Sequence, residues 1–183
     1  KNDEIITYLK NHGFMLARYD STVVSIDTVN AKTNLTTHFN TGSWYSYNEI
    51  KIEKDGESNS EVSDNLIKYL TNINIGDAYK EDELSKSRVR LARTGLFSSV
   101  NLKGVLSDSL KNKVRLLITG TVATLNELSP EVFADNEFNF FNVGVGLSYI
   151  RKNFLGDARK LTLRTRFRIN DITNVRFGSG SFK

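Results

Sequence analysis

The sequence contains no cysteine and only one proline among its 183 residues. The absence of cysteine excludes a disulfide scaffold and a thiolate metal site. No apolar run approaches the roughly 20 residues that a membrane-spanning helix needs. The chain also has no large excess of one charge, since it contains 25 Lys and Arg and 21 Asp and Glu. Basic residues gather only in the last quarter, and this balance disfavours a nucleic-acid partner.

Groups that could carry out chemistry are equally scarce. The two histidines, His12 and His38, lie in different segments without companions of the kind that ligate metals, whereas a metal site needs three or four such groups. The acidic run Glu81–Glu83 lies at the start of a predicted helix, where the helix dipole favours carboxylates. No nucleophile has a neighbouring base, and no phosphate-binding loop is present. We therefore expect a protein that is not an enzyme and that uses no cofactor or metal.

The stretch Gly76–Leu102 predicts an amphipathic helix followed directly by a strand. Leu84 and Leu91 recur at helical spacing, and Gly95 stands where a left-handed residue closes a helix. The elements around this helix are a strand and a helix before it and two hairpin strands after it. Their predicted ranges are 44–53, 62–70, 100–106 and 113–119. The order strand, helix, helix, strand, strand predicts an α+β domain.

The beginning of the chain repeats the second half of this order, as helix, strand and strand. Gly13-Phe14-Met15 corresponds to Gly95-Leu96-Phe97 at a domain-sized spacing. Since Lys1 opens directly onto a helix without a signal peptide, we expect the sequence to start within a longer precursor.

The β-α-α-β-β order, together with the string GDAY…LSKSRVRLARTGLFSSV, resembles a POTRA (polypeptide-transport-associated) domain. The residues that match its pattern are Leu84, Leu91, Gly95, Phe97 and Val100. By this resemblance, residues 1–45 are the C-terminal part of one POTRA domain and residues 46–121 are a complete one. The residues alone also allow an unrelated small α+β domain. Lys80 departs from the pattern, because a capping Ser or Thr is common there; the helix cap is then expected from Asp77 or from backbone groups.

The last quarter shows a different pattern. Residues 122–136 contain Pro130 without periodicity and are predicted to be a linker, and residues 137–183 are predicted to be the incomplete start of an outer-membrane β-barrel. Two segments there alternate strictly between an apolar face and a small or cationic face. This division is typical of transmembrane β-strands, with lipid on one side and a polar lumen on the other. A soluble hairpin also alternates, so that alternative remains open. Residues 170–183 match no pattern.

The string FNVGVGLSYIRKNFLGDARKLTL resembles the first barrel hairpin of the BamA/TamA superfamily of outer-membrane assembly proteins, in which a barrel follows the last POTRA domain. The resemblance implies a protein of the bacterial outer membrane with its POTRA domains in the periplasm. It would bind unfolded clients by β-strand addition and aid their insertion into the membrane. The partners implied are unfolded outer-membrane protein clients, periplasmic or lipoprotein accessory subunits, and outer-membrane lipid.

The resemblance also implies three sets of site residues. The edge strand for client or partner addition comprises Ser99, Val100, Asn101, Leu102 and Lys103. The barrel seam strand, taken as the first of the barrel, comprises Val143, Gly144, Val145, Gly146, Leu147, Ser148 and Tyr149. The basic residues expected to face the lumen are Arg164, Arg166 and Arg168.

Three other functional hypotheses remain open. A two-partner-secretion transporter also joins POTRA domains to a barrel, and a TamA-type barrel serves lipid or surface-protein traffic. A soluble periplasmic POTRA scaffold would lack the barrel altogether. The sequence identifies neither the client nor the accessory subunits.

Overall fold

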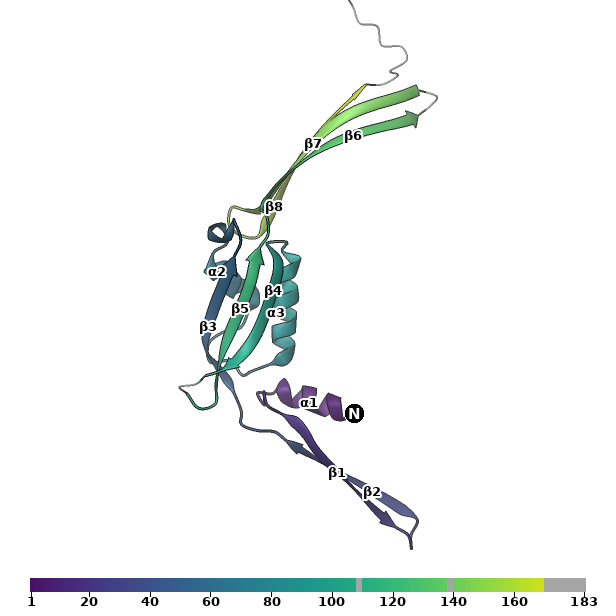
Figure 1. Cartoon of the computed structure of the whole chain (residues 1–183), viewed down its shortest axis with the longest axis vertical. Helices are drawn as coiled ribbons and strands as arrows, with labels where there is room; N and C mark the ends of the chain where they lie inside the picture. Colours follow the sequence, from purple (N-terminus) through teal and green to yellow (C-terminus); the bar gives the residue numbers. More distant parts are fainter. Residues whose placement is uncertain (108–109, 138–139, 170–183) are drawn as a thin grey trace, which may run out of the picture. The chain divides into compact units, whose positions relative to one another are not determined.

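A computed structural model of the chain describes residues 1–107, 110–137 and 140–169. These residues belong to two units, one spanning Lys1–Ala123 and the other starting at Thr124. Figure 1 shows the elements of both units in chain order. No helix in the described ranges has the length and apolar character needed to cross a membrane.

The first unit begins with helix α1 (Asn2–Lys10) and the antiparallel hairpin of β1 (Arg18–Asp27) and β2 (Lys32–Asn40). The Asp27 carboxylate closes the hairpin turn. It accepts hydrogen bonds from the backbone N–H groups of Val29 and Asn30, at 3.0 and 3.1 Å. The side-chain amide of Asn30 donates a third bond at 2.8 Å. These bonds stabilise the charged carboxylate, so they lower the pKa of Asp27.

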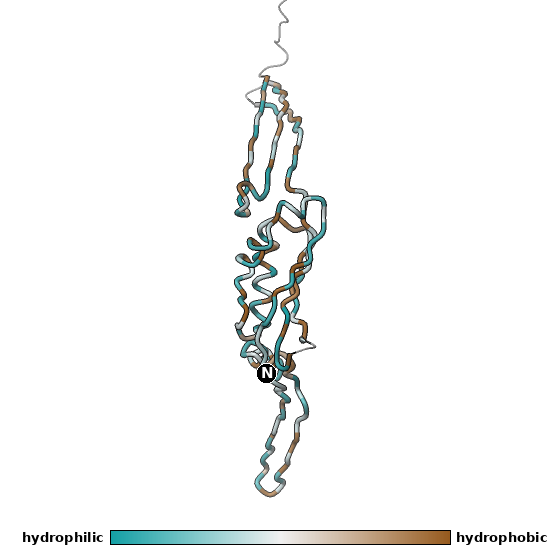
Figure 2. The backbone as a smooth tube through the Cα atoms, turned by 90° about the vertical axis from the view of Figure 1, so that its left-hand side faces the viewer, coloured by the Kyte–Doolittle hydropathy of each residue, from teal (hydrophilic) through white to brown (hydrophobic). Residues whose placement is uncertain are grey.

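The first unit continues with a three-stranded sheet and two helices. The elements are β3 (Ser46–Asp55), a 3₁₀ turn η1 (Asn59–Glu61), α2 (Asp64–Thr71), α3 (Glu81–Arg93), β4 (Phe97–Leu106) and β5 (Lys113–Val122). The sheet order is β3-β5-β4, with β5 parallel to β3 and antiparallel to β4. Figure 2 shows the helices on one side of the strands.

The core lies between the two helices and the sheet. Helix α3 contributes Leu91 from its inner face, and β5 contributes alternate residues, as a strand with one covered face does. The fully buried apolar side chains of this core include Val62, Ile67, Leu91, Leu96, Val114 and Leu116. Burying each such side chain contributes about 1.5–3 kcal/mol, so this core fixes the position of the strands at its border.

Polar contacts fix α2 against α3. The Ser63 hydroxyl caps α2 by accepting from the N–H of Leu66 at 3.2 Å. At the other end of α2, the Thr71 carbonyl accepts from the Ser87 hydroxyl and from the Arg90 guanidinium, both at 2.6 Å. Carbonyls at a helix end lack partners within the helix, and α3 supplies them here.

The predicted repeat of the helix exit is present in the structure. Gly13 after α1 and Gly95 after α3 both have positive φ, +98° and +68°. Glycine adopts this region without steric cost. In both copies a strand follows within a few residues, β1 in the first and β4 in the second.

The second unit is a three-stranded antiparallel sheet of order β6-β7-β8. Its strands are β6 (Asn126–Glu137), β7 (Phe140–Phe154) and β8 (Arg159–Ile169). The prediction that residues 122–136 form a linker is wrong, because β6 occupies most of them. Leu128, Val132 and Ala134 share one parity with Pro130, and Ser129, Glu131 and Asp135 share the other with Phe133. This partial alternation was a strand signal, but the proline and Phe133 interrupt it. Proline is tolerated on an edge strand, where its missing N–H removes no ladder bond.

Candidate functional site

Strand β4 carries the residues predicted to receive an added strand. Ser99–Lys103 lie within it, and β4 pairs with β5 on one side, for example through Leu102 opposite Ile118. Among the described residues, no strand pairs with its other side. A strand in this position presents a row of N–H and C=O groups without ladder partners. The structure thus places the predicted segment at an edge of the sheet.

The other edge of the sheet, β3, is partly covered by the loop before α3. The Tyr47 N–H donates to the Asp77 carbonyl at 2.9 Å, and the Tyr47 carbonyl accepts from Gly76 at 2.7 Å. Ser46 also forms a bridge with Ala78. Because these contacts occupy the beginning of β3, β4 is the more accessible edge.

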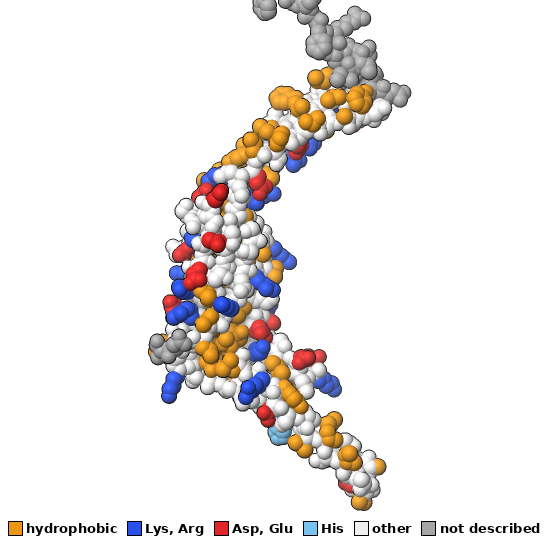
Figure 3. All heavy atoms as spheres, viewed as in Figure 1, with side chains coloured by type: hydrophobic (Ala, Val, Ile, Leu, Met, Phe, Trp, Pro, Cys, Tyr) orange, Lys and Arg blue, Asp and Glu red, His pale blue; other side chains and the backbone are white. Residues whose placement is uncertain are grey.

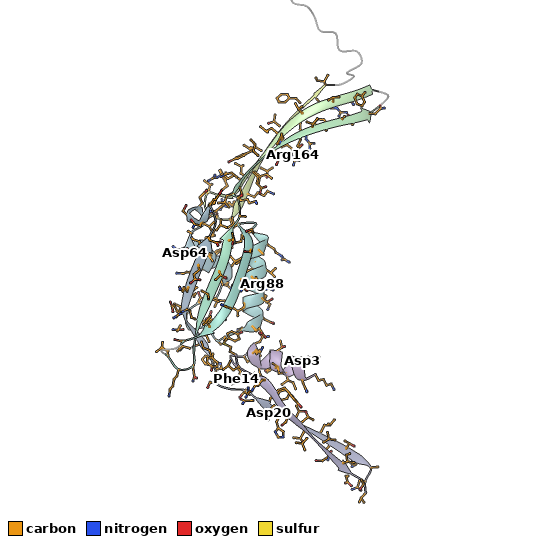
Figure 4. The ribbon with its side chains drawn as sticks, viewed as in Figure 1. Asp3, Phe14, Asp20, Asp64, Arg88 and Arg164 are labelled. Carbon is orange, nitrogen blue, oxygen red and sulfur yellow. The ribbon has the colours of Figure 1, made fainter. Side chains whose placement is uncertain are left out.

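A groove of about 400 Å³ runs between α3 and β4. Its floor is apolar and nearly buried, with Tyr79, Leu84 and Leu102 exposed by 6–8%. Arg88, one turn after Leu84, lines the same groove, and Figure 4 marks it on α3. An extended segment added to β4 would therefore place alternate side chains next to this floor.

The groove has an uneven charge distribution. Glu81 lines it, but its carboxylate is engaged by Lys10 at 3.2 Å. Arg88 has no ion pair among the described residues. Burial in the first place, and the charge of Glu81 in the second, raise the pKa of Tyr79 to about 12.

Lys10 and Asn11, at the C-terminal end of α1, contact the start of α3 beside this groove. The side-chain oxygen of Asn11 accepts from the backbone N–H of Asp82 at 2.8 Å, and Lys10 pairs with Glu81. The N-cap residue of α3, Lys80, makes no capping bond of its own. The cap that the sequence led us to expect from Asp77 or from backbone groups thus comes from Asn11, a polar residue 71 positions earlier in the chain. No local sequence signal points to it.

The second unit has two chemically different faces. Figure 3 shows apolar side chains along one side of β6–β8 and charged ones along the other. The register explains this division, since Val132 lies opposite Val145, which lies opposite Phe167. These three side chains are 81%, 54% and 69% exposed. Other large apolar side chains exposed on this face include Leu128, Leu147, Leu163 and Ile169.

The three predicted basic residues lie on the opposite face, and each has an acidic partner on β6. Arg166 pairs with Glu131 at 2.8 Å, and Arg164 approaches the same carboxylate at 3.7 Å. Arg168 pairs with Asp135 at 3.0 Å. The acids of β6 thus offset the charge of three arginines that lie on one face of β8. That this face lines a lumen stays a prediction.

The predicted seam strand is not at an edge. Val143–Tyr149 lie in β7, which pairs with β6 on one side and with β8 on the other along this whole segment. The assignment is wrong because β6 was taken for a linker, which made β7 the first strand. The first strand described in the second unit is β6, and it lies at an edge of that sheet.

In the described ranges, no cluster of three or more His, Asp or Glu side chains is placed to hold a metal ion.

Comparison with known proteins agrees with the geometry of the first unit. Residues 45–119 match the POTRA family model, described as a surface antigen variable number repeat. Residues 45–119 thus form a POTRA domain, as predicted from the strand and helix order. A search of curated proteins finds no match.

Two solved structures share the fold of nearly the whole chain. The crystal structure of BamA from Haemophilus ducreyi lacking POTRA domains 1–3 has a TM-score of 0.66 at 15% identity, over 91% of this chain and 30% of that one. CdiB from Acinetobacter baumannii has a TM-score of 0.55 at 16% identity, over 92% of this chain and 30% of that one. The chain therefore spans about 30% of the length of each. The predicted fold class, α+β with POTRA-type β-α-α-β-β modules followed by an antiparallel barrel hairpin, is confirmed, although β6 precedes that hairpin.

Proposed function

We propose that this chain is the POTRA and barrel-entry region of an outer-membrane assembly or secretion factor and that it is not an enzyme. Its POTRA domain binds an extended segment of an unfolded client by strand addition to β4. Its β6–β8 sheet enters the outer membrane, and the POTRA domain works in the periplasm. Periplasmic or lipoprotein accessory subunits complete the assembly.

The observation that carries the proposal is the free edge of β4 beside the groove of α3. Strand addition uses backbone bonds for affinity and side-chain pockets for selection. Both are present here in a domain that matches the POTRA model. Backbone bonding tolerates many sequences, as a factor with several clients requires.

The apolar face of the second unit supports a membrane location. A soluble protein rarely leaves a contiguous apolar patch of this kind uncovered, whereas a transmembrane barrel turns such a face toward lipid and the polar face toward its interior. This argues against the soluble periplasmic scaffold. Between assembly and secretion, the shared fold with BamA and CdiB favours neither. A plug helix ahead of the POTRA domains would favour the secretion transporter.

Proline substitution in β4 tests strand addition. Consecutive N–H groups of an antiparallel strand point alternately into the ladder and away from it. Of Val100→Pro and Asn101→Pro, one therefore damages the β4–β5 ladder and the other blocks only an added strand. Thermal unfolding of the two variants identifies which is which.

The variant that keeps parental stability should reduce client folding in proteoliposomes. Lys111→Pro, in the loop before β5, is the matched control and should leave client folding unchanged. Parental client folding in the stable edge variant would refute strand addition at β4.

A further inference from the structure

The edge of β4 carries positive charge on both faces of the sheet. Arg88 lines the groove on the face that packs against the helices. Lys103 also borders this groove, and because it follows the buried Leu102 in β4, its side chain lies on the outer face of the sheet. We propose that this edge selects an acidic extended segment, one in which apolar side chains alternate with or neighbour Asp and Glu. This inference rests on the proposed function and names the chemistry of the client segment.

On the face of the sheet that packs against the helices, the groove has an apolar floor and one cation, Arg88, without an acidic partner among the described residues. Leu84 and Leu102 offer the floor, and Arg88 follows Leu84 by one helical turn, so both face the same groove. The nearest acid in the groove, Glu81, is already engaged by Lys10. Arg88 has no hydrogen-bonded or ion-paired partner in the part of the chain that the structure describes. A carboxylate on the incoming segment would supply one.

The outer face presents a second cation in register. Lys103 lies opposite Leu117 of β5, and Leu117 lies opposite Lys51 of β3. Lys51 is engaged by Glu53 at 2.8 Å. A strand added beyond β4 would place a side chain about 4.5–5.5 Å from that of Lys103. Opposite charges stabilise such a cross-strand pair and like charges destabilise it.

The acids near the sheet do not cancel this preference. Glu49 is engaged by Arg115 at 2.6 Å, on the strands away from the β4 edge. The pKa of Glu53 is lowered chiefly by the hydrogen bond from Lys51, and the charge of Lys103 has the smallest effect on it. Arg88 and Lys103 are therefore both available to a client segment at the β4 edge, and a basic segment is repelled on both faces of the sheet.

Peptide binding tests the selectivity. Three labelled peptides share one alternating apolar pattern and carry Asp/Glu, Asn/Gln or Lys at the polar positions. Fluorescence anisotropy with the chain in detergent micelles should rank them acidic, neutral, basic. The differences should shrink at high salt, because exposed charges are screened.

Arg88→Gln and Lys103→Gln should each weaken the acidic peptide by about two- to fivefold, the range expected for one exposed charge pair. Both should reduce the preference for the acidic over the neutral peptide. Arg93→Gln changes the same charge on α3 outside the groove and should alter no peptide. Equal affinity for all three peptides, or preference for the basic one, would overturn the inference.

The two proposals fail in different ways. If the stable proline variant blocks all peptides while charge has no effect, strand addition at β4 stands and the acidic selectivity falls. If the proline variant binds every peptide as the parent does, strand addition itself falls.

Discussion

Arg166 of β8 bonds to Glu131 of β6 across the whole width of β7. The guanidinium donates to one carboxylate oxygen through Nη2 at 2.8 Å and through Nε at 3.1 Å. Two strands separated by a third lie roughly 9.5 Å apart, and a side chain on the middle strand would stand between them. The middle residue of this row is Gly146. Because Gly146 has no side chain, Arg166 of β8 can reach Glu131 of β6 across β7.

This pair should hold β6 in the sheet beyond its backbone ladder. With the arginine about half exposed and the glutamate 28% exposed, a double-mutant cycle of Glu131→Gln and Arg166→Gln should give a coupling of about 0.5–1 kcal/mol. Hydrogen exchange in lipid nanodiscs should show faster exchange of β6 amides in Glu131→Gln. Asp157→Asn removes an exposed pair in the β7–β8 turn and should leave β6 unaffected. Unchanged β6 exchange in Glu131→Gln would contradict the coupling.

The two glycines of β7 should respond differently to alanine. A Cβ on Gly144 would lie 2.2 Å from the Phe133 ring and 2.6 Å from the Phe167 carbonyl, whereas one on Gly146 would meet nothing closer than 3.2 Å. Gly144→Ala should therefore cost about 1–3 kcal/mol through overpacking. Gly146→Ala should cost less, because Arg166 Cγ and the Thr165 carbonyl, both at 3.2 Å from the added Cβ, need to move by only a few tenths of an ångström. Urea unfolding in detergent micelles measures both, and equal costs would contradict overpacking at Gly144.

These glycines show where the sequence was informative and where it was not. Alternation along residues 142–149 placed Gly144 and Gly146 on the polar face, which is correct. The resemblance to the BamA/TamA superfamily assigned their strand to a barrel seam. The structure shows neighbouring side chains lying over them instead. Which side chain crosses a glycine depends on the register of three strands, and local periodicity does not contain it.

The POTRA domain was predictable because its signals are local. Helical spacing of Leu84 and Leu91, a glycine after the helix and two alternating strands suffice to give the order of elements. The groove beside β4 was not predictable, since Tyr79 and Arg88 reach it only through the packing of α3 on the sheet. The strand β6 was missed because Pro130 was given more weight than the alternation around it.

Tyr79 provides a test of groove burial through its titration. Its pKa is raised to about 12, above the ordinary value of about 10, because burial disfavours the charged phenolate. The folded state therefore favours the neutral phenol. Its contribution to stability is fully present below about pH 10 and is lost as the pH rises from about 10 to about 12. The difference in tyrosinate absorbance between the parent and Tyr79→Phe should titrate near pH 12. A difference titration centred near pH 10 would mean that water reaches the phenol.

The cap that Asn11 gives to α3 can be tested by removal and by replacement. Asn11→Ala should destabilise the first unit by about 1 kcal/mol, the usual cost of losing a helix N-cap, because Lys80 supplies no side-chain bond. Lys80→Ser introduces a local cap at the N-terminal position of the same helix, so the double variant Asn11→Ala/Lys80→Ser should recover most of that loss in chemical unfolding. Ser63→Ala removes the local cap of α2 and should not be rescued by Lys80→Ser.

Hydrogen exchange tests whether Asn11 also joins α1 to α3. Because Asn11 directly follows α1, Asn11→Ala should raise hydrogen exchange in α1. The double variant Asn11→Ala/Lys80→Ser should restore the stability of α3 but not the protection of α1. Restored protection of both helices would mean that Asn11 acts on α3 alone and does not join the two modules.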